Sequence, residues 1–322
     1  MASPKSATSG RQSPDGVLII DKPAGWTSHD VVARVRKLMK TRRVGHTGTL
    51  DPFATGVLVL CLNRATRLVQ FMTLDQKEYL ATMRLGLATD TGDLTGQPIS
   101  EVSEARHITA EMVEAALAAS RGRIKQVPPM YSAKKVAGVK LYELARRGQE
   151  IAREPVEIEI KELELCDAPT NAAAPASETS EIPTRDFSFR VVCSAGTYVR
   201  TLAEDLGARL GVGAHLTQLR RLRAGNCELQ RSITLDRLAE LTESGEVDET
   251  LISMSEVITL EEVRVGVEDC VNIGYGRPVK SRGEWLNGTL AKLCDRGGQL
   301  LAIAQYDADQ QLWRPRVVLL EG

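Results

Sequence analysis

The segment from residue 45 to residue 62 constrains the fold of this chain more than any other stretch. Its first part, Gly45 to Gly56, places three glycines, one proline and several small residues around a single carboxylate, that of Asp51. Its second part, Val57 to Leu62, is an unbroken apolar run. This pattern predicts a rigid loop that enters a buried strand, and loops braced in this way often carry catalytic groups. An Asp-Pro pair is also a common turn initiator, so the spacing alone leaves both a catalytic and a turn role open for Asp51.

Strand and helix signals alternate along the rest of the first 225 residues. The sequence predicts strands over 16–20, 78–86, 155–166 and 186–193, and helices over 27–40, 109–120 and 197–210. The alternation of apolar and charged residues slips near Lys161–Glu162, which predicts a β-bulge in the third of these strands. Strands that alternate with helices predict a mixed sheet with helices packed against it.

Three other segments differ in texture from this part. Residues 1–15 are polar and rich in serine without an apolar stretch, which predicts a disordered tail and not a signal peptide. Residues 167–184 are rich in Ala, Pro, Ser and Thr and predict a flexible insertion in a main domain over 16–250. Short strand-like runs at 263–267, 290–294, 300–306 and 317–320, separated by Gly and Asn turns, predict a small β-rich domain over 255–322.

Composition excludes several classes of protein. The chain has 322 residues, of which 43% are hydrophobic and 26% charged, as in ordinary soluble globular proteins. No apolar run approaches the roughly 20 residues that a membrane helix needs. The six cysteines are scattered without a Cys-x-x-Cys pair, which argues against a zinc site or a disulfide framework and fits a reducing cytoplasm.

The distribution of charge matters more than the net charge of −1. Residues 31–50 contain six basic and no acidic side chains, and residues 121–153 contain nine basic side chains against Glu143 and Glu150. Acidic residues gather elsewhere, over 90–114 and 236–262. Such segregation predicts a basic face for phosphates on a nearly neutral protein, although solvated helix faces give the same pattern.

Four stretches of the chain resemble the signatures of one family. They are 18–28, which contains Asp21-Lys22-Pro23; 45–56, which contains Asp51; 128–148; and 193–202, which contains the run Gly-Thr-Tyr-Val-Arg ending at Arg200. In this order they are similar to the bacterial pseudouridine synthases of the TruB family, and they span roughly residues 16 to 225. The resemblance implies an α+β fold: a mixed, largely antiparallel sheet flanked by helices, followed by a small C-terminal β-rich PUA-like domain that binds RNA.

The resemblance also implies an activity, the isomerisation of uridine 55 in the T-loop of tRNA to pseudouridine by base flipping. This reaction breaks the bond between base N1 and ribose C1′ and joins C5 to C1′. Nothing is oxidised and no group leaves, so the expected enzyme needs no cofactor and no metal. The partner would be the T-arm and T-loop of tRNA, and the basic insertion at 121–153 would close over that arm. We expect a cytoplasmic monomer with no obligate protein partner and no membrane association.

The family pattern assigns the catalytic aspartate to Asp51, its arginine partner to Arg200 and a third catalytic role to Tyr79. A carboxylate can act at C1′ as a nucleophile or as a stabiliser of positive charge. Burial raises the pKa of a carboxyl group, and we expect the bidentate pair with Arg200 to reverse that rise. Without the family context, Arg200 would be read as a surface helix charge and Tyr79 as a core residue.

Further residues are expected to bind the substrate. His46 would occupy the space left by the flipped nucleotide, and Tyr198 and Leu219 would line the pocket with Tyr79. The remaining members of this set are basic and would lie near phosphates: Lys22, Lys134, Lys135 and Arg146. Lys22 could equally be structural, and the sequence does not decide between these two roles.

Two other functions fit parts of the sequence. One is an RNA-folding chaperone whose isomerase activity is secondary or lost, because base flipping opens the tRNA elbow. The other is the catalytic subunit of a guide-RNA-directed particle, which shares the aspartate motif. The form of residues 130–133, Met-Tyr-Ser-Ala, and the lack of a lysine-rich tail favour the stand-alone enzyme.

Overall fold

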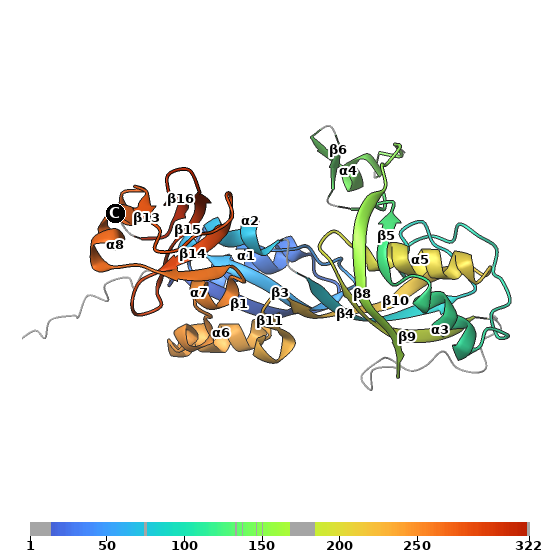
Figure 1. Ribbon diagram of the computed structural model, residues 1–322. Helices are drawn as coiled ribbons and strands as arrows, with labels where there is room; N and C mark the ends of the chain where they lie inside the picture. The colour runs from blue at the N-terminus through green and yellow to red at the C-terminus, as the bar shows by residue number, and fades with distance from the viewer. Residues whose placement is uncertain are drawn as a thin grey trace, which may run out of the picture.

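One large sheet forms the body of the protein (Figure 1). The computed structural model describes residues 14–73, 76–132, 134–136, 138–145, 147–149, 151–167 and 184–320. Within these residues the sheet has nine strands, and its main path is β1 (Gly16–Lys22), β3 (Thr55–Leu62), β10 (Ala214–Ala224), β4 (Lys77–Leu85), β9 (Arg185–Cys193), β8 (Val156–Cys166) and β5 (Gly122–Gln126). The short strands β2 (Val44–His46) and β11 (Cys227–Glu228) pair with β3 and β10. Only the β3–β10 pairing is parallel, so the expected mixed, largely antiparallel sheet is confirmed.

Helices flank the sheet, and the longer ones are α1 (Ser28–Leu38), α3 (Ala110–Ala118), α5 (Val199–Arg209) and α6 (Leu235–Ser244). Of these, α1, α3 and α5 lie where the sequence predicts helices, whereas α6 was not predicted. Between them lie α2 (Val69–Met72), α4 (Leu141–Ala145), α7 (Met254–Val257) and three 3₁₀ turns, η1 (Asn63–Leu68), η2 (Leu229–Arg231) and η3 (Val247–Thr250). None of the helices in the described part of the chain is both long and apolar enough to span a membrane.

The start of α1 shows how local sequence sets these boundaries. Thr27 accepts a hydrogen bond from the Asp30 amide at 3.1 Å, and the Asp30 carboxylate accepts one from the Thr27 amide at 2.9 Å. This capping box satisfies two amides that the helix itself leaves without partners, and such caps contribute about 1 kcal/mol. The bulge in β8 is confirmed as well, because the pairing of β8 with β9 shifts between Ile160 and Glu162.

The unbroken apolar run of β3 follows from burial on both faces. Leu58, Leu60 and their neighbours on β1 belong to the main core, which lies between the sheet and the helices α1, α3, α5 and α6. Val57 and Val59 point the other way, into a second core that includes Leu300 and Ile303 of the C-terminal domain. Because no face of β3 meets water, the alternation of apolar and polar residues disappears from its sequence.

The C-terminal domain is β-rich, as predicted, and packs at one end of the elongated molecule (Figure 1). Its sheet runs in the order β12 (Glu261–Arg264), β14 (Leu290–Cys294), β15 (Leu300–Asp307), β16 (Leu312–Val318) and β13 (Val279–Lys280). The domain has its own small core around the buried Trp313. Arg64 and Arg67 of the main domain donate to the carbonyls of Leu319 and Val318, at 3.1 and 2.7 Å, which ties the last strand to the large sheet.

Several predicted boundaries differ from the structure. The strand expected over 263–267 ends at Arg264, and Val267 begins helix α8 (Val267–Gly274) after Gly266 as N-cap. The strand expected over 317–320 is the end of β16, whose earlier part is hidden in sequence by Arg314, Pro315 and Arg316. The predicted insertion at 167–184 falls outside the described residues except at its two ends. The same holds for residues 1–13 of the predicted tail, whereas Asp15 pairs with Arg64.

The basic insertion predicted over 121–153 has two parts. Residues 122–126 are β5, the edge strand that pairs with β8. The chain between β5 and β8, residues 127–155, then projects away from the sheet and is called the arm here (Figure 1). The arm contains the two-stranded pair β6 (Lys135–Val136) and β7 (Val139–Lys140), followed by α4.

Gly56, near the start of β3, tests how closely β3 and β10 pack against each other. Its φ is +97°, and a Cβ at this position would overlap the backbone carbonyl of Arg221 on β10. Gly211 also has a positive φ, +75°, but a Cβ there would meet open space. We expect Gly56→Ala to lower the free energy of unfolding by more than about 3 kcal/mol and Gly211→Ala by only about 1–2 kcal/mol. Urea denaturation of both variants measures the difference, and equal losses would contradict the close approach of β3 and β10.

Candidate active site

Asp51 and Arg200 meet in the structure, although 149 residues separate them in sequence. Arg200 Nε lies 2.9 Å from Asp51 Oδ2, and Arg200 Nη2 donates to Asp51 Oδ1 at 3.2 Å. The contact is therefore bidentate, the geometry in which a guanidinium orients a carboxylate most firmly. The Arg200 side chain is 4% exposed, whereas the Asp51 side chain keeps 32% exposure. The Asp51 carboxylate is therefore accessible, whereas the Arg200 guanidinium is buried.

Backbone carbonyls from two other segments hold the Arg200 guanidinium in place. Its Nη1 donates to the carbonyl of Thr91 at 2.6 Å, and its Nη2 donates to the carbonyl of Tyr131 at 2.7 Å. A second carboxylate, that of Asp93, lies 3.8 Å from Nη1. The start of α5 is fixed separately, because the Gln126 side-chain amide accepts from the Tyr198 N–H at 2.8 Å and donates to its carbonyl at 3.1 Å.

The loop that carries Asp51 is braced on both sides of the aspartate. Before it, the Ser28 hydroxyl accepts from the Leu50 amide at 2.9 Å and lies 3.2 Å from the Leu50 carbonyl. After it, the Pro52 carbonyl accepts from the Gly25 amide at 2.8 Å and from Lys22 Nζ at 3.2 Å. The rigid loop predicted from the sequence is therefore held by the residues that precede and open α1.

Lys22 lies under this loop and not on the surface. It is 0% exposed, and its ammonium donates to the carbonyls of Pro23, Trp26 and Pro52 at 2.8, 2.7 and 3.2 Å. Burial lowers the pKa of Lys22 to about 8, and the nearby Asp51 opposes that fall. With all three donors used inside the protein, Lys22 fits the structural role that the sequence left open beside a phosphate contact.

Two cavities adjoin the Asp51–Arg200 pair. The first has a volume of about 280 Å³, and its wall includes Tyr79, Tyr198 and Leu219, the three residues expected to enclose the base. The second, of about 490 Å³, is lined by His29, Thr91, Asp93, Tyr131 and Tyr142 among others. Asp51 and Arg200 line both, so the pair forms part of the wall between them.

Arg221 and Lys77 also line the first cavity, and the sequence did not mark either of them. Arg221 is 2% exposed, and its guanidinium donates to the carbonyls of Val57 and Gly48 at 2.6 and 3.0 Å. It lies in an arginine-rich strand, β10, where the sequence does not separate a buried arginine from its exposed neighbours. The burial of Arg221 beneath the loop at Gly48 follows from the pairing of β10 with β3, which the sequence alone does not show.

The pKa of Asp51 is raised above its ordinary value. Burial is the main cause, Arg200 lowers the pKa by its charge and hydrogen bond, and Asp93 raises it further. The expectation that Arg200 reverses the effect of burial is therefore wrong in its net direction: the arginine offsets only part of it. A carboxylate with a raised pKa is a stronger nucleophile once it is ionised.

Tyr79 and His46 are both neutral at ordinary pH. Burial raises the pKa of Tyr79, so its phenol keeps its proton and does not act as a ready base in the free protein. Burial and the neighbouring His29 lower the pKa of His46 to about 4. The His46 ring meets His29 edge-on at 5.7 Å, and its Nδ1 is buried without a hydrogen-bond partner among the described residues.

Three basic residues were expected on the arm, and the structure describes the side chain of only one of them, Lys134. The backbone of Lys134 accepts a hydrogen bond from the Leu141 amide at 2.9 Å, and Lys134 lines neither cavity. The backbone of Lys135 pairs with Lys140 in β6–β7, but its side chain lies outside the description, as does Arg146 altogether. Across the residues that the structure describes, no group of three or more His, Cys, Asp or Glu side chains is placed to hold a metal ion.

Comparison with known proteins decides the family. Residues 36–199 match the TruB family pseudouridylate synthase N-terminal domain, and residues 200–266 match the tRNA pseudouridylate synthase B C-terminal domain. The chain belongs to the TruB family of pseudouridylate synthases. The first match contains Asp51 and Tyr79, and the second begins at Arg200.

Relatives and solved structures agree with this assignment. The chain is 42% identical to tRNA pseudouridine synthase B of Geobacter sulfurreducens, over 93% of this chain and 95% of the relative. It is 43% identical to the protein of the same name from Mycobacterium leprae, over 89% and 86%. Among solved structures, a Cbf5-Nop10-Gar1 complex matches with a TM-score of 0.70 at 25% identity, over 96% of this chain and 85% of that one. An H/ACA RNP bound to a substrate RNA with 2′-deoxyuridine matches equally well in fold, with a TM-score of 0.70 at 24% identity, over 95% and 85%.

These matches confirm the expected pseudouridine synthase fold and the expectation that the protein is an isomerase.

Arg200→Lys tests the bidentate pair. An ammonium cannot contact both oxygens of Asp51 and at the same time reach the carbonyls of Thr91 and Tyr131. We expect single-turnover pseudouridine formation to fall by about 100-fold or more, the usual effect of removing a preorganised charged donor. Arg209→Lys, an exposed change on the same helix, serves as the control. Near-normal turnover of Arg200→Lys would remove the pair from the mechanism.

Proposed function

We propose that this protein converts uridine 55 in the T-loop of tRNA to pseudouridine. The observation that carries the proposal is the Asp51–Arg200 pair in the wall of a cavity that is also lined by Tyr79, Tyr198 and Leu219. That cavity, at about 280 Å³, lies at the small end of ligand sites, which suits a single nucleobase. Relatives at 42–43% identity carry the name tRNA pseudouridine synthase B, which supports tRNA as the substrate.

In the proposed reaction the carboxylate of Asp51 acts on ribose C1′ as the bond from C1′ to base N1 breaks. It does so either as a nucleophile or by stabilising the positive charge that develops there. The detached uracil turns within the cavity, C5 joins C1′, the proton leaves C5 and N1 gains a proton. Atoms and electrons balance without an oxidant, so this chemistry requires no cofactor.

The apolar and aromatic side chains around the cavity would hold the base while it turns. Tyr79 is 9% exposed and Leu219 is 7% exposed, so both present only a small surface, toward the cavity. Stacking on a neutral tyrosine tolerates rotation of the base because it needs no fixed hydrogen bond. The neutral His46 would fill the gap that the flipped nucleotide leaves in the RNA, by stacking and without acid or base chemistry.

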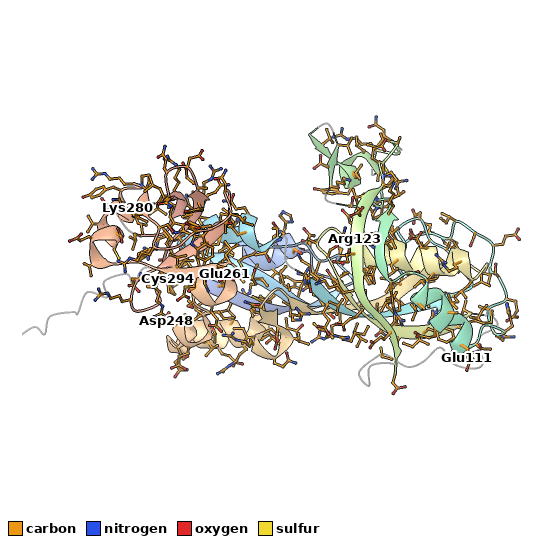
Figure 2. All side chains as sticks on the ribbon, in the orientation of Figure 1. Glu111, Arg123, Asp248, Glu261, Lys280 and Cys294 are labelled. Carbon is orange, nitrogen blue, oxygen red and sulfur yellow. The ribbon has the colours of Figure 1, made fainter. Side chains whose placement is uncertain are left out.

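The arm and the basic edge strand would bind the RNA backbone. Arg123 and Lys125 of β5 are exposed, and Figure 2 shows Arg123 near the base of the arm. The Tyr131 carbonyl, at the start of the arm, contacts Arg200, which connects RNA binding at the arm to the catalytic pair.

We further propose that residues 16–250 form the catalytic domain and that residues 255–322 form a PUA-like RNA-binding domain. We also propose that the enzyme acts in the cytoplasm as a monomer without a guide RNA.

Asp51→Asn separates catalysis from binding. The substitution keeps the shape of the side chain but removes the charge that would act at C1′, so we expect single-turnover rates to fall by about 1,000-fold or more. Binding to unmodified tRNA should stay within about 3-fold, because the RNA contacts lie elsewhere. The measurement maps pseudouridine by position in unmodified tRNA and compares wild type with the variant.

Modification by the wild-type enzyme at a position other than 55 would overturn the proposed specificity. Unchanged cellular phenotypes with a catalytically dead variant would favour the RNA chaperone instead.

The salt dependence of tRNA binding tests the arm. Each phosphate neutralised by a cation contributes about −0.7 to −0.9 to the slope of log K against log salt concentration. We expect Lys134→Ala combined with Arg147→Ala to make the slope shallower by about 1.4 to 1.8, because each substitution removes one phosphate contact. Arg237→Ala on α6 is the control, because Arg237 pairs with Glu240 on another part of the surface. An identical slope in the arm variant would remove these cations from the RNA interface.

A further inference from the structure

Glu204 is a half-buried carboxylate that the mechanism above leaves unused. It lies on α5 four residues after Arg200, one helical turn away, so both side chains project from the same side of the helix. Tyr79 and Arg221 line the first cavity, but Glu204 lines neither cavity beside Asp51. Among the described residues, Glu204 also has no hydrogen-bond partner, although the charge of Arg200 influences it.

The carboxyl group of Glu204 lies against the turn that holds Arg200. Gly92 in this turn has a φ of +70°, and a Cβ on it would overlap Glu204 Oε1 and lie 3.0 Å from the carboxyl carbon. The same Cβ would lie 3.3 Å from Cβ of Arg200. The Thr91–Gly92 peptide is therefore packed between the stem of Arg200 and the head of Glu204, and its carbonyl is the one that accepts from Arg200 Nη1 at 2.6 Å.

The other side of this turn is anchored to the sheet. The Gly92 carbonyl accepts from the Leu216 amide of β10 at 2.9 Å, and Asp93 forms an isolated parallel bridge with Leu216. The Asp93 carboxylate is occupied by the Thr95 amide at 2.9 Å and by the hydroxyl of Thr91, also at 2.9 Å. Backbone hydrogen bonds thus fix the turn to the sheet, and the Glu204 carboxyl packs against the turn at Gly92.

We propose that Glu204 is a positioning residue that sets the Thr91–Asp93 turn against Arg200 and, by its charge, controls how strongly Arg200 neutralises Asp51. This inference rests on the proposed catalytic role of Asp51. Ionised Glu204 adds a third negative charge around one guanidinium, beside Asp51 and Asp93, and weakens the hold of Arg200 on the Asp51 charge. The Asp51 carboxylate is then more reactive at C1′.

The charged groups around Glu204 determine when this happens. Arg200 and Asp205 face it from its own helix, Asp93 from the turn, and Arg153 from the segment before β8. Burial is the largest influence and raises the pKa of Glu204 to about 7. The group is therefore neutral in mildly acidic solution and ionised in mildly alkaline solution, and the single-turnover rate should rise as pH passes through this range.

The test is a pH profile of single-turnover pseudouridine formation at saturating enzyme, from about pH 5.5 to about pH 8.5, the range in which the group titrates. We expect the wild-type rate to rise about 3- to 10-fold around pH 7, as one negative charge is added near Arg200. Glu204→Gln keeps the shape and cannot ionise, so its rate should stay near the low-pH wild-type value across the whole range. Binding of tRNA should be unchanged, because the effect is on catalysis.

Asp205→Asn is the matched control, because it removes an equal charge from the next position of α5 and leaves the Gly92 contact in place. It should keep the inflection. Glu204→Asp, which keeps a titratable group, should keep an inflection at a shifted pH. A wild-type profile without an inflection, or an inflection that survives in Glu204→Gln, would overturn the proposal.

The pH dependence of thermal stability gives a second test of the raised pKa of Glu204. A folded-state pKa above the unfolded value means that ionising Glu204 costs stability, a cost absent in acid and complete above pH 7. Relative to wild type, the thermal midpoint of Glu204→Gln should therefore rise with pH, and a falling difference would also count against the proposal. An active Asp51→Asn variant would refute the proposed function itself, whereas an inactive one together with a persistent inflection in Glu204→Gln would refute only this inference.

Discussion

The guanidinium of Arg200 is the contact on which the active site depends. It joins three loop segments that are far apart in sequence: the Asp51 loop, the turn at Thr91–Asp93 and the start of the arm at Tyr131. Because a guanidinium is planar and offers donors in fixed directions, each of these segments must take one position relative to the others. Orientation of the carboxylate and placement of the arm are thus consequences of one buried side chain.

Burying that cation would be costly if its donors were not satisfied. Two carbonyls and the Asp51 carboxylate meet it at 2.6 to 3.2 Å, and Asp93 adds a second negative charge at 3.8 Å. Burial, with a smaller contribution from the Asp93 charge, explains why the pKa of Asp51 stays raised despite the arginine. The site therefore holds its carboxylate firmly without fully neutralising it, as the proposed action of Asp51 at a sugar carbon requires.

The scaffold makes this arrangement possible through strands that are buried on both faces. β1 and β3 are covered by helices on one side and by the C-terminal domain on the other, so the Asp51 loop leaves a strand end that has little freedom to move. Lys22 and Ser28 then fasten the loop to the turn before α1. The C-terminal domain contributes to the rigidity of the site through this second core, whatever contacts it makes with RNA.

Local patterns predicted much of the architecture because their causes are local. The capping residue Thr27, the bulge near Lys161 and the period of α5 each depend on neighbours a few residues away. The pairing of Asp51 with Arg200 came from the family resemblance and not from spacing, since 149 residues of chain separate them. The C-terminal strands were placed less well, because Pro315 and its flanking arginines hide β16 and because Gly266 starts a helix where a strand was expected.

The sequence by itself determined most elements of the first 225 residues, the apolar strand behind the Asp51 loop and the family to which the motifs point. Tertiary structure alone decided the roles of the charged residues: that Lys22 faces inward to three carbonyls, that Arg221 lies beneath the cavity and that Glu204 rests on Gly92. The reason is physical. Whether a charged side chain is solvated or buried depends on which distant segments cover it, and burial, more than residue type, sets both its partners and its pKa.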